Sequence, residues 1–172
     1  GATPLALAYQ GGMEAIQQHY TMDQIFWGGI PGSIGETNKP FIILGALFLI
    51  FTRVASWRIM AGMVLGVGVT GMLFNAWGFN AFMMVPWYYH YVLGSFLFAM
   101  AFMATDPVTA SGTNKGKWIY GFFIGVVGLV VRVLNPAYPE GWMLAILFMN
   151  SFAPLIDYFI VQSNIKKRTS RV

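Results

Sequence analysis

The sequence contains no cysteine, which excludes disulfide bonds, cysteine-ligated zinc and cysteine-ligated iron–sulfur clusters within its 172 residues. It contains two histidines, His19 and His90, too few for a haem pair together with any other histidine site. Charged residues are also scarce, at 9% of the chain, whereas soluble domains carry about 25%. Most side chains must therefore contact lipid or other apolar side chains, and not water.

Hydrophobic residues make up 57% of the chain and are concentrated in five apolar segments. These segments are residues 40–52, 59–77, 85–104, 118–134 and 142–162. A membrane-spanning helix needs about 20 residues, so the first segment is short for a span. We predict an all-α polytopic membrane protein with about five transmembrane helices. Glycine-rich and interrupted spans would suit one half of an inverted-repeat-like bundle.

Basic residues are distributed unevenly between the two faces that five crossings create. One face receives only Lys39 and Arg132. The other receives Arg53, Arg58, Lys115, Lys117, Lys166, Lys167, Arg168 and Arg171. Because basic loops remain cytoplasmic, we predict a cytoplasmic C-terminus and an N-terminal segment on the periplasmic face of a bacterial inner membrane. This distribution is typical of a membrane protein and gives no reason to expect a nucleic-acid partner.

The topology divides the chain into three parts. Residues 1–38 form a non-cytoplasmic segment with surface helices and a loop, residues 39–165 form the five-helix transmembrane domain, and residues 166–172 form a basic cytoplasmic tail. The second span carries Gly62 and Gly66 in a GxxxG spacing, which permits close helix approach. We expect the chain to be the C-terminal part of a longer protein.

A glycine-rich loop at residues 28–37 precedes the first apolar segment. Its small residues would let backbone N–H groups approach an anionic group such as a phosphate. Alternatively, the loop is an ordinary turn before a helix, with Thr37 or Asn38 near the N-cap and Pro40 at an early helical position. Both interpretations stay open.

Two carboxylates lie in or beside the apolar segments, where an unpaired charge is costly. Asp106 precedes Pro107 at the end of the third segment and could simply terminate that helix. Asp157 follows Pro154, and a proline frees a backbone carbonyl within a helix. Carboxylate and carbonyl oxygens suit a hard cation, so both acids are candidates for a Na⁺ path. The alternative for Asp157 is an ion pair with Arg53, Arg58 or a lysine of the tail.

Several longer segments are more specific than any single residue. They read GSIGET at 32–37, MATDPVTAS at 103–111, NPAYPEG at 135–141 and FAPLID at 152–157. Together they resemble the NqrB/RnfD family, the membrane subunits of the sodium-translocating NADH:quinone reductase and of the related Rnf complex. The resemblance covers residues 1–168 and corresponds to the second half of the family's subunit. Segments 113–118, 135–141 and 164–168 are more similar to NqrB than to RnfD.

The resemblance implies a covalent flavin. The family attaches FMN at a Ser-Gly-Ala-Thr motif, of which Gly1-Ala2-Thr3 is present, so Thr3 is expected to carry FMN through a phosphodiester bond. The other residues expected at the cofactor site are Gly32, Ser33, Gly35, Glu36, Tyr138 and Glu140. For Arg132 and Glu140, a mutual ion pair or a contact to the flavin phosphate is expected.

The resemblance also implies a function. The chain would be the FMN-carrying subunit of a respiratory Na⁺-pumping NADH:quinone oxidoreductase, passing electrons toward quinone with Na⁺ export, and not catalytic alone. Riboflavin would bind non-covalently in the full-length subunit. The expected partners are other subunits of the complex, which would supply NADH oxidation and iron–sulfur centres, together with quinone and lipid. The alternatives are an RnfD-type subunit and half of a flavin-free channel or transporter.

Overall fold

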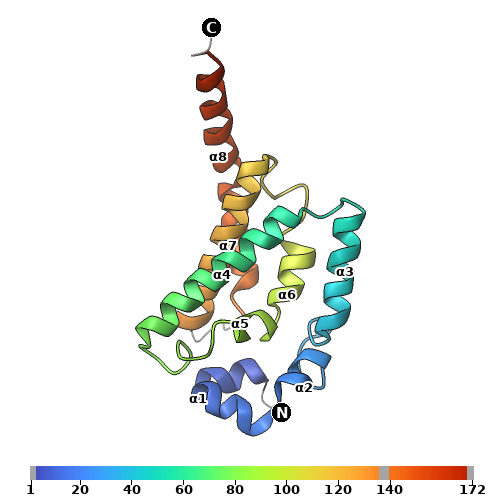
Figure 1. Ribbon diagram of the computed structural model, residues 1–172, viewed down its shortest axis with the longest axis vertical. Helices are drawn as coiled ribbons and strands as arrows, with labels where there is room; N and C mark the ends of the chain where they lie inside the picture. The colour runs from blue at the N-terminus through green and yellow to red at the C-terminus, as the bar shows by residue number, and fades with distance from the viewer. Residues whose placement is uncertain (1–2, 136–139, 170–172) are drawn as a thin grey trace.

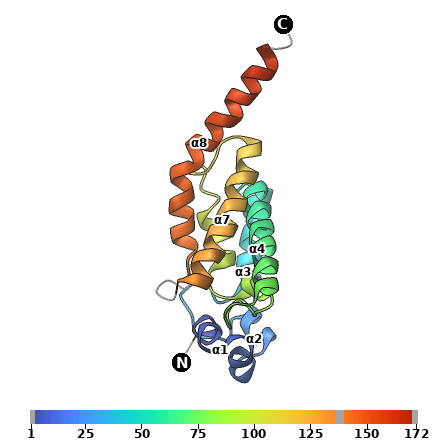
Figure 2. The ribbon, with the colours of Figure 1, turned by 90° about the vertical axis from the view of Figure 1, so that its left-hand side faces the viewer.

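The computed structural model describes residues 3–135 and 140–169, and this part of the chain is helical without any strand. Helices α4 (Trp57–Trp77), α7 (Asn114–Leu134) and α8 (Trp142–Thr169) are long and apolar enough to cross a membrane. Helix α3 (Lys39–Phe51) is apolar but shorter. Figure 2 shows α8 on one side of α7, with α4 and α3 on the other. These features confirm the prediction of an all-α polytopic membrane protein.

Two short helices lie across one end of the bundle, as the sequence predicts for surface helices (Figure 1). Helix α1 (Pro4–His19) bends at Gly12, whose φ of 63° brings it against the backbone of Ala81. Helix α2 (Met22–Trp27) begins with a capping box, which satisfies backbone N–H groups at its first turn. The end of α8 lies at the opposite end of the molecule, so the two terminal regions are far apart (Figure 1).

Helices α4 and α7 cross in direct backbone contact through glycines. A Cβ atom at Gly66 would lie 2.2 Å from the carbonyl oxygen of Phe122, and one at Gly121 would lie 2.3 Å from that of Ile59. Both distances are below any normal contact. The close approach that the GxxxG spacing predicts is therefore present, and it depends on the missing side chains.

Substituting Gly66 by alanine is expected to lower the thermal unfolding temperature of the full-length protein in detergent, because the added methyl group forces α4 and α7 apart. Overpacking of this kind costs about 1–3 kcal/mol. The matched control is Gly29→Ala, where the nearest atom to an added Cβ is the carbonyl oxygen of Gln24 at 3.9 Å. If both variants unfold at the same temperature, the backbone contact does not limit stability.

The third apolar segment, residues 85–104, corrects the prediction of a single continuous span. It contains three short helices: α5 (Tyr89–Val92), α6 (Phe96–Phe98) and the π-helix η1 (Ala99–Met103). They are aligned with α3 in the bundle (Figure 1). This segment therefore enters the bundle as a broken helix.

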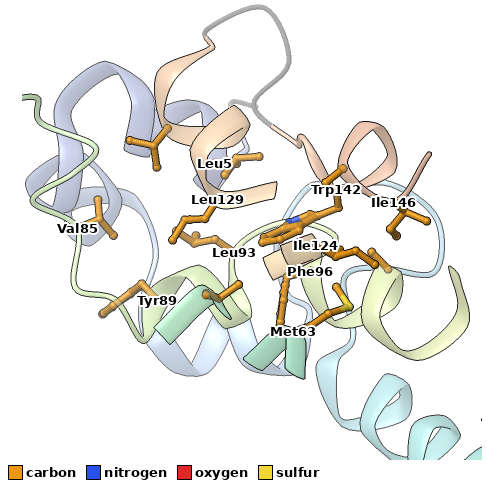
Figure 3. Close-up of a cluster of buried hydrophobic side chains, with 14 of the residues drawn as sticks. Leu5, Met63, Val85, Tyr89, Leu93, Phe96, Ile124, Leu129, Trp142 and Ile146 are labelled. Carbon is orange, nitrogen blue, oxygen red and sulfur yellow. The ribbon is translucent and has the colours of Figure 1, made fainter. Parts of the chain in front are cut away.

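The break lies at Leu93 and Gly94. Leu93 is extended, with ψ of 129°, and Gly94 has φ of 61°, a left-handed conformation that glycine adopts without steric cost. Hydropathy does not reveal this break because Leu93 and Gly94 are as compatible with a membrane span as their neighbours. The buried core adjoins the break, where Phe96 packs against the Trp142 ring at 4.8 Å between centroids and Leu93 lies close by (Figure 3).

Candidate functional site

Two buried cations compensate for the hydrogen bonds that the helix break removes. The Arg132 side chain is fully buried, and its Nη1 donates to the carbonyl oxygens of His90 at 3.2 Å and Leu93 at 3.0 Å. Lys39 is 1% exposed, and its Nζ donates to the carbonyl oxygen of Gly94 at 3.0 Å and to that of Glu36. A buried carbonyl without a partner is costly, so these cations stabilise the broken backbone.

Glu140 provides negative charge beside these cations. Its Oε2 lies 3.6 Å from Arg132 Nη2 and accepts hydrogen bonds from the backbone N–H of Ser95, at 3.0 Å, and from the Ser95 hydroxyl. The Arg132 guanidinium also lies over the Trp142 ring, 4.9 Å from its centroid. The ion pair expected between Arg132 and Glu140 is therefore confirmed.

A small cavity of about 30 Å³ brings residues from distant parts of the chain together. Four of the residues predicted to bind the cofactor line it. They are Thr3, Gly32, Glu36 and Glu140. Lys39 and Gly94 complete the polar part of the same wall. The cavity thus joins the start of α1, the glycine-rich loop, the start of α3 and the helix break.

Thr3 occupies the N-cap of α1. Its Oγ1 accepts a hydrogen bond from the backbone N–H of Ala6 at 3.2 Å, and Pro4 follows as the first helical residue. The Thr3 hydroxyl therefore lies where free backbone N–H groups give the helix terminus partial positive charge. Gly1 and Ala2, the other residues of the attachment tripeptide, are outside the described residues.

The remaining predicted residues are placed differently. The backbone N–H of Ser33 donates to Glu36 Oε1 at 3.0 Å, which holds the loop in shape. Gly35 has φ of 90° and faces Phe98. Neither is among the described residues that line the cavity. Tyr138 lies outside the described residues, so its expected contact with the cofactor stays a prediction.

The end of the glycine-rich loop has the features of an ordinary helix start. Asn38 is the N-cap of α3 and accepts from the backbone N–H of Phe41 at 3.2 Å, with Pro40 in the first turn. This part of the alternative interpretation is confirmed. It is compatible with a role at the cavity, because Gly32 and Glu36 line the cavity wall while Asn38 caps the helix.

Sequence reasoning missed the roles of Lys39 and Gly94. Lys39 counted only as one basic residue in the topology, although a lysine at the first position of an apolar helix is an available signal of burial with partners. Gly94 stood inside an apolar run without any pattern around it. Its importance comes from contacts with residues 38 or more positions away, such as Arg132 and Lys39.

Asp157 and Asp106 lie at the other end of the bundle. Asp157 Oδ1 accepts from the hydroxyls of Ser111 and Thr113, both at 2.6 Å, and from the Thr113 N–H at 3.1 Å. Its Oδ2 accepts from the N–H of Gly112 at 2.7 Å. These donors stabilise the ionised carboxylate and attach the loop before α7 to α8.

Asp106 is exposed and shapes its own loop. It accepts from the Thr109 hydroxyl at 2.8 Å and from the backbone N–H groups of Val108 and Thr109, both at 3.3 Å. The Thr109 hydroxyl, followed by the Val108 N–H, lowers the pKa of Asp106 below its usual value. Asp106 therefore ends the third segment in a polar turn, as one of the two interpretations expected, and it is ionised at neutral pH.

The fold and these clusters define a multi-pass helical membrane protein with a buried cation–carboxylate cluster at one end. The NQR2, RnfD, RnfE family profile matches residues 1–166, and the chain belongs to this family. It is 56% identical to a protein of Chromohalobacter salexigens over 99% of the chain, 54% identical to one of Klebsiella pneumoniae and 51% identical to one of Haemophilus influenzae. Each of these relatives is named as the NqrB subunit of a Na(+)-translocating NADH-quinone reductase. The chain spans 42–43% of their length.

Proposed function

We propose that this chain is the FMN-carrying part of the NqrB subunit of a Na⁺-translocating NADH:quinone reductase, with FMN joined to Thr3 Oγ1 through a phosphodiester bond. The names of the relatives favour this subunit over the RnfD alternative. The observation that carries the proposal is the shared cavity, which places Thr3 beside Lys39 and the glycine-rich loop. Passage of electrons toward quinone, coupled to Na⁺ export with partner subunits, is part of the same proposal.

The residues present fit the phosphate end of FMN. A phosphoryl group on Thr3 would lie at the positive end of α1, with Lys39 on the same cavity wall. Glu36 and Glu140 would repel it, but Glu36 accepts from Ser33 and Glu140 is paired with Arg132. The cavity of about 30 Å³ is too small for an isoalloxazine ring, so the ring would lie outside it.

When bound, FMN would supply electron transfer at its ring, and the protein would position it and tune its potential. Lys39 and Arg132 place two positive charges at this end of the molecule, which favour negative charge on a nearby flavin. The relatives' greater length leaves room for the proposed riboflavin site in the rest of the full-length protein. We propose that this end faces the periplasm and that the basic tail faces the cytoplasm.

The proposal is tested by mass spectrometry of the peptide that contains Thr3, released from the full-length protein expressed with its flavin transferase. The expected result is a peptide whose mass is raised by that of FMN less one water, with fragment ions that place the addition on Thr3. Unmodified Thr3 in a protein that is otherwise active in quinone reduction would overturn the proposal.

We further propose that Asp157, and Asp106 in the same loop region, serve the Na⁺ path. The support is a group of oxygen atoms from the Asp157 carboxylate and the hydroxyls of Ser111 and Thr113. Oxygen atoms of this kind are the ligands that hard cations prefer. A cation at this position would compete with the hydrogen bonds that the carboxylate now accepts.

Replacing Asp157 by asparagine is expected to raise the Na⁺ concentration for half-maximal turnover of the complex at least about tenfold, since one lost charge contact of about 1.4 kcal/mol has that effect. The control is Asp23→Asn, an exposed acid in the first turn of α2 at the opposite end. If Asp157 only attaches the loop to α8, the variant will unfold at a lower temperature while its Na⁺ dependence stays unchanged.

A further inference from the structure

Three cations surround a pocket at the end of the molecule opposite the flavin site. Arg53 ends the turn after α3, Arg58 lies in the first turn of α4, and Lys117 lies in the first turn of α7. All three line one pocket of about 380 Å³, and no carboxylate is among the described residues that line it. A water molecule occupies about 30 Å³ in the liquid, so the pocket holds a much larger anionic group.

The start of α4 adds donors to this pocket. Ser56 is the N-cap of α4, yet its hydroxyl makes no capping hydrogen bond. The Ser56 Oγ atom is buried without a hydrogen-bond partner in the part of the chain that the structure describes, and Ser56 lines the pocket. Backbone N–H groups in the first turn of a helix of 21 residues have no intrahelical partner and favour an anion.

An apolar groove runs from the same pocket along the membrane-spanning part. It lies between α3, α4 and the broken third segment, has a volume of about 250 Å³, and shares Ile50 with the cationic pocket. Its lining is almost wholly apolar and includes Ala46, Ala61 and Met100. Trp57 and Trp118 pack edge to face at 5.6 Å beside the cationic pocket, and tryptophan is typical of the membrane interface.

We propose that this combined site binds one anionic phospholipid, with its phosphate headgroup among Arg53, Arg58 and Lys117 and an acyl chain in the groove. The charge selects an anion, since the three cations face no acid among the described residues of the pocket. The continuity of the pocket with the groove selects a lipid over a soluble phosphate. Basic pockets between helices on the cytoplasmic side are suited to such headgroups.

The test uses the full-length protein in nanodiscs of equal parts phosphatidylglycerol and phosphatidylcholine, followed by native mass spectrometry. The wild type is expected to retain one phosphatidylglycerol in preference to phosphatidylcholine. Each cation near an anionic headgroup strengthens binding about fivefold, so the triple variant Arg53→Gln, Arg58→Gln and Lys117→Gln should lose on the order of 100-fold. The control triple variant removes the same charge from the same face at Lys115, Lys166 and Arg168.

A second pair of variants separates a lipid from a free phosphate. Ala61→Phe fills the groove while leaving the three cations, and it should displace phosphatidylglycerol. Ala76→Phe, an exposed position near the other end of α4, should not. Retention of phosphatidylglycerol in Ala61→Phe, equal losses in the two triple variants, or equal retention of both lipids by the wild type would each overturn the proposal. Matching thermal unfolding temperatures exclude misfolding as the cause.

Discussion

Replacing Thr3 by alanine in the full-length protein is expected to abolish covalent flavin and to reduce quinone reduction by the complex to background. The Thr3 hydroxyl supplies the oxygen of the proposed phosphodiester bond, and alanine has no group that can replace it. Thr3 also caps α1, and loss of an N-cap costs about 1 kcal/mol, too little to unfold a stable domain. The expected loss is therefore chemical and not structural.

The measurement is flavin fluorescence of the full-length protein in a denaturing gel, together with turnover of the purified complex. Thr3→Ser is the matched control, because serine retains both the hydroxyl and the capping hydrogen bond. It should keep the fluorescent band at wild-type or reduced intensity. A Thr3→Ala protein that remains fluorescent would place the flavin elsewhere, and one with full turnover would make the flavin dispensable.

Replacing Arg132 by leucine is expected to destabilise the protein by about 3 kcal/mol or more. Removing one partner of a buried ion pair costs about 3–5 kcal/mol, and the half-exposed Glu140 points to the lower end of that range. The variant also leaves the carbonyl oxygens of His90 and Leu93 without the donor they share. Thermal unfolding in detergent should show a clear decrease in midpoint temperature.

Two further variants identify the cause of this loss. Arg168→Leu removes an arginine from the exposed end of α8 and should leave the midpoint nearly unchanged. Glu140→Gln should destabilise less than Arg132→Leu, and the double variant should lose less than the sum of the two. Strict additivity would mean that Arg132 stabilises the helix break through the backbone carbonyls alone, without coupling to Glu140.

Much of the fold follows from local patterns. The apolar segments, the surface helices before them and the close contact at Gly62 and Gly66 are all predicted by residues near one another in sequence. The break at Gly94 is not, because its stability comes from Lys39 and Arg132, which are distant in the chain. Periodicity and hydropathy describe the average environment of a segment, and they contain no information about which distant donor meets a backbone carbonyl.

The candidate site shows the same division. The sequence named Thr3, Gly32, Glu36 and Glu140 through resemblance to a family, and it placed them on one face by counting charges. Only the tertiary structure brings them around one cavity, adds Lys39 to it, and places Ser33 and Gly35 in supporting positions instead. Composition alone determined that this chain meets lipid, because hydrophobicity is a property of each residue; which charges meet inside it depends on packing between helices, which is a property of the whole fold.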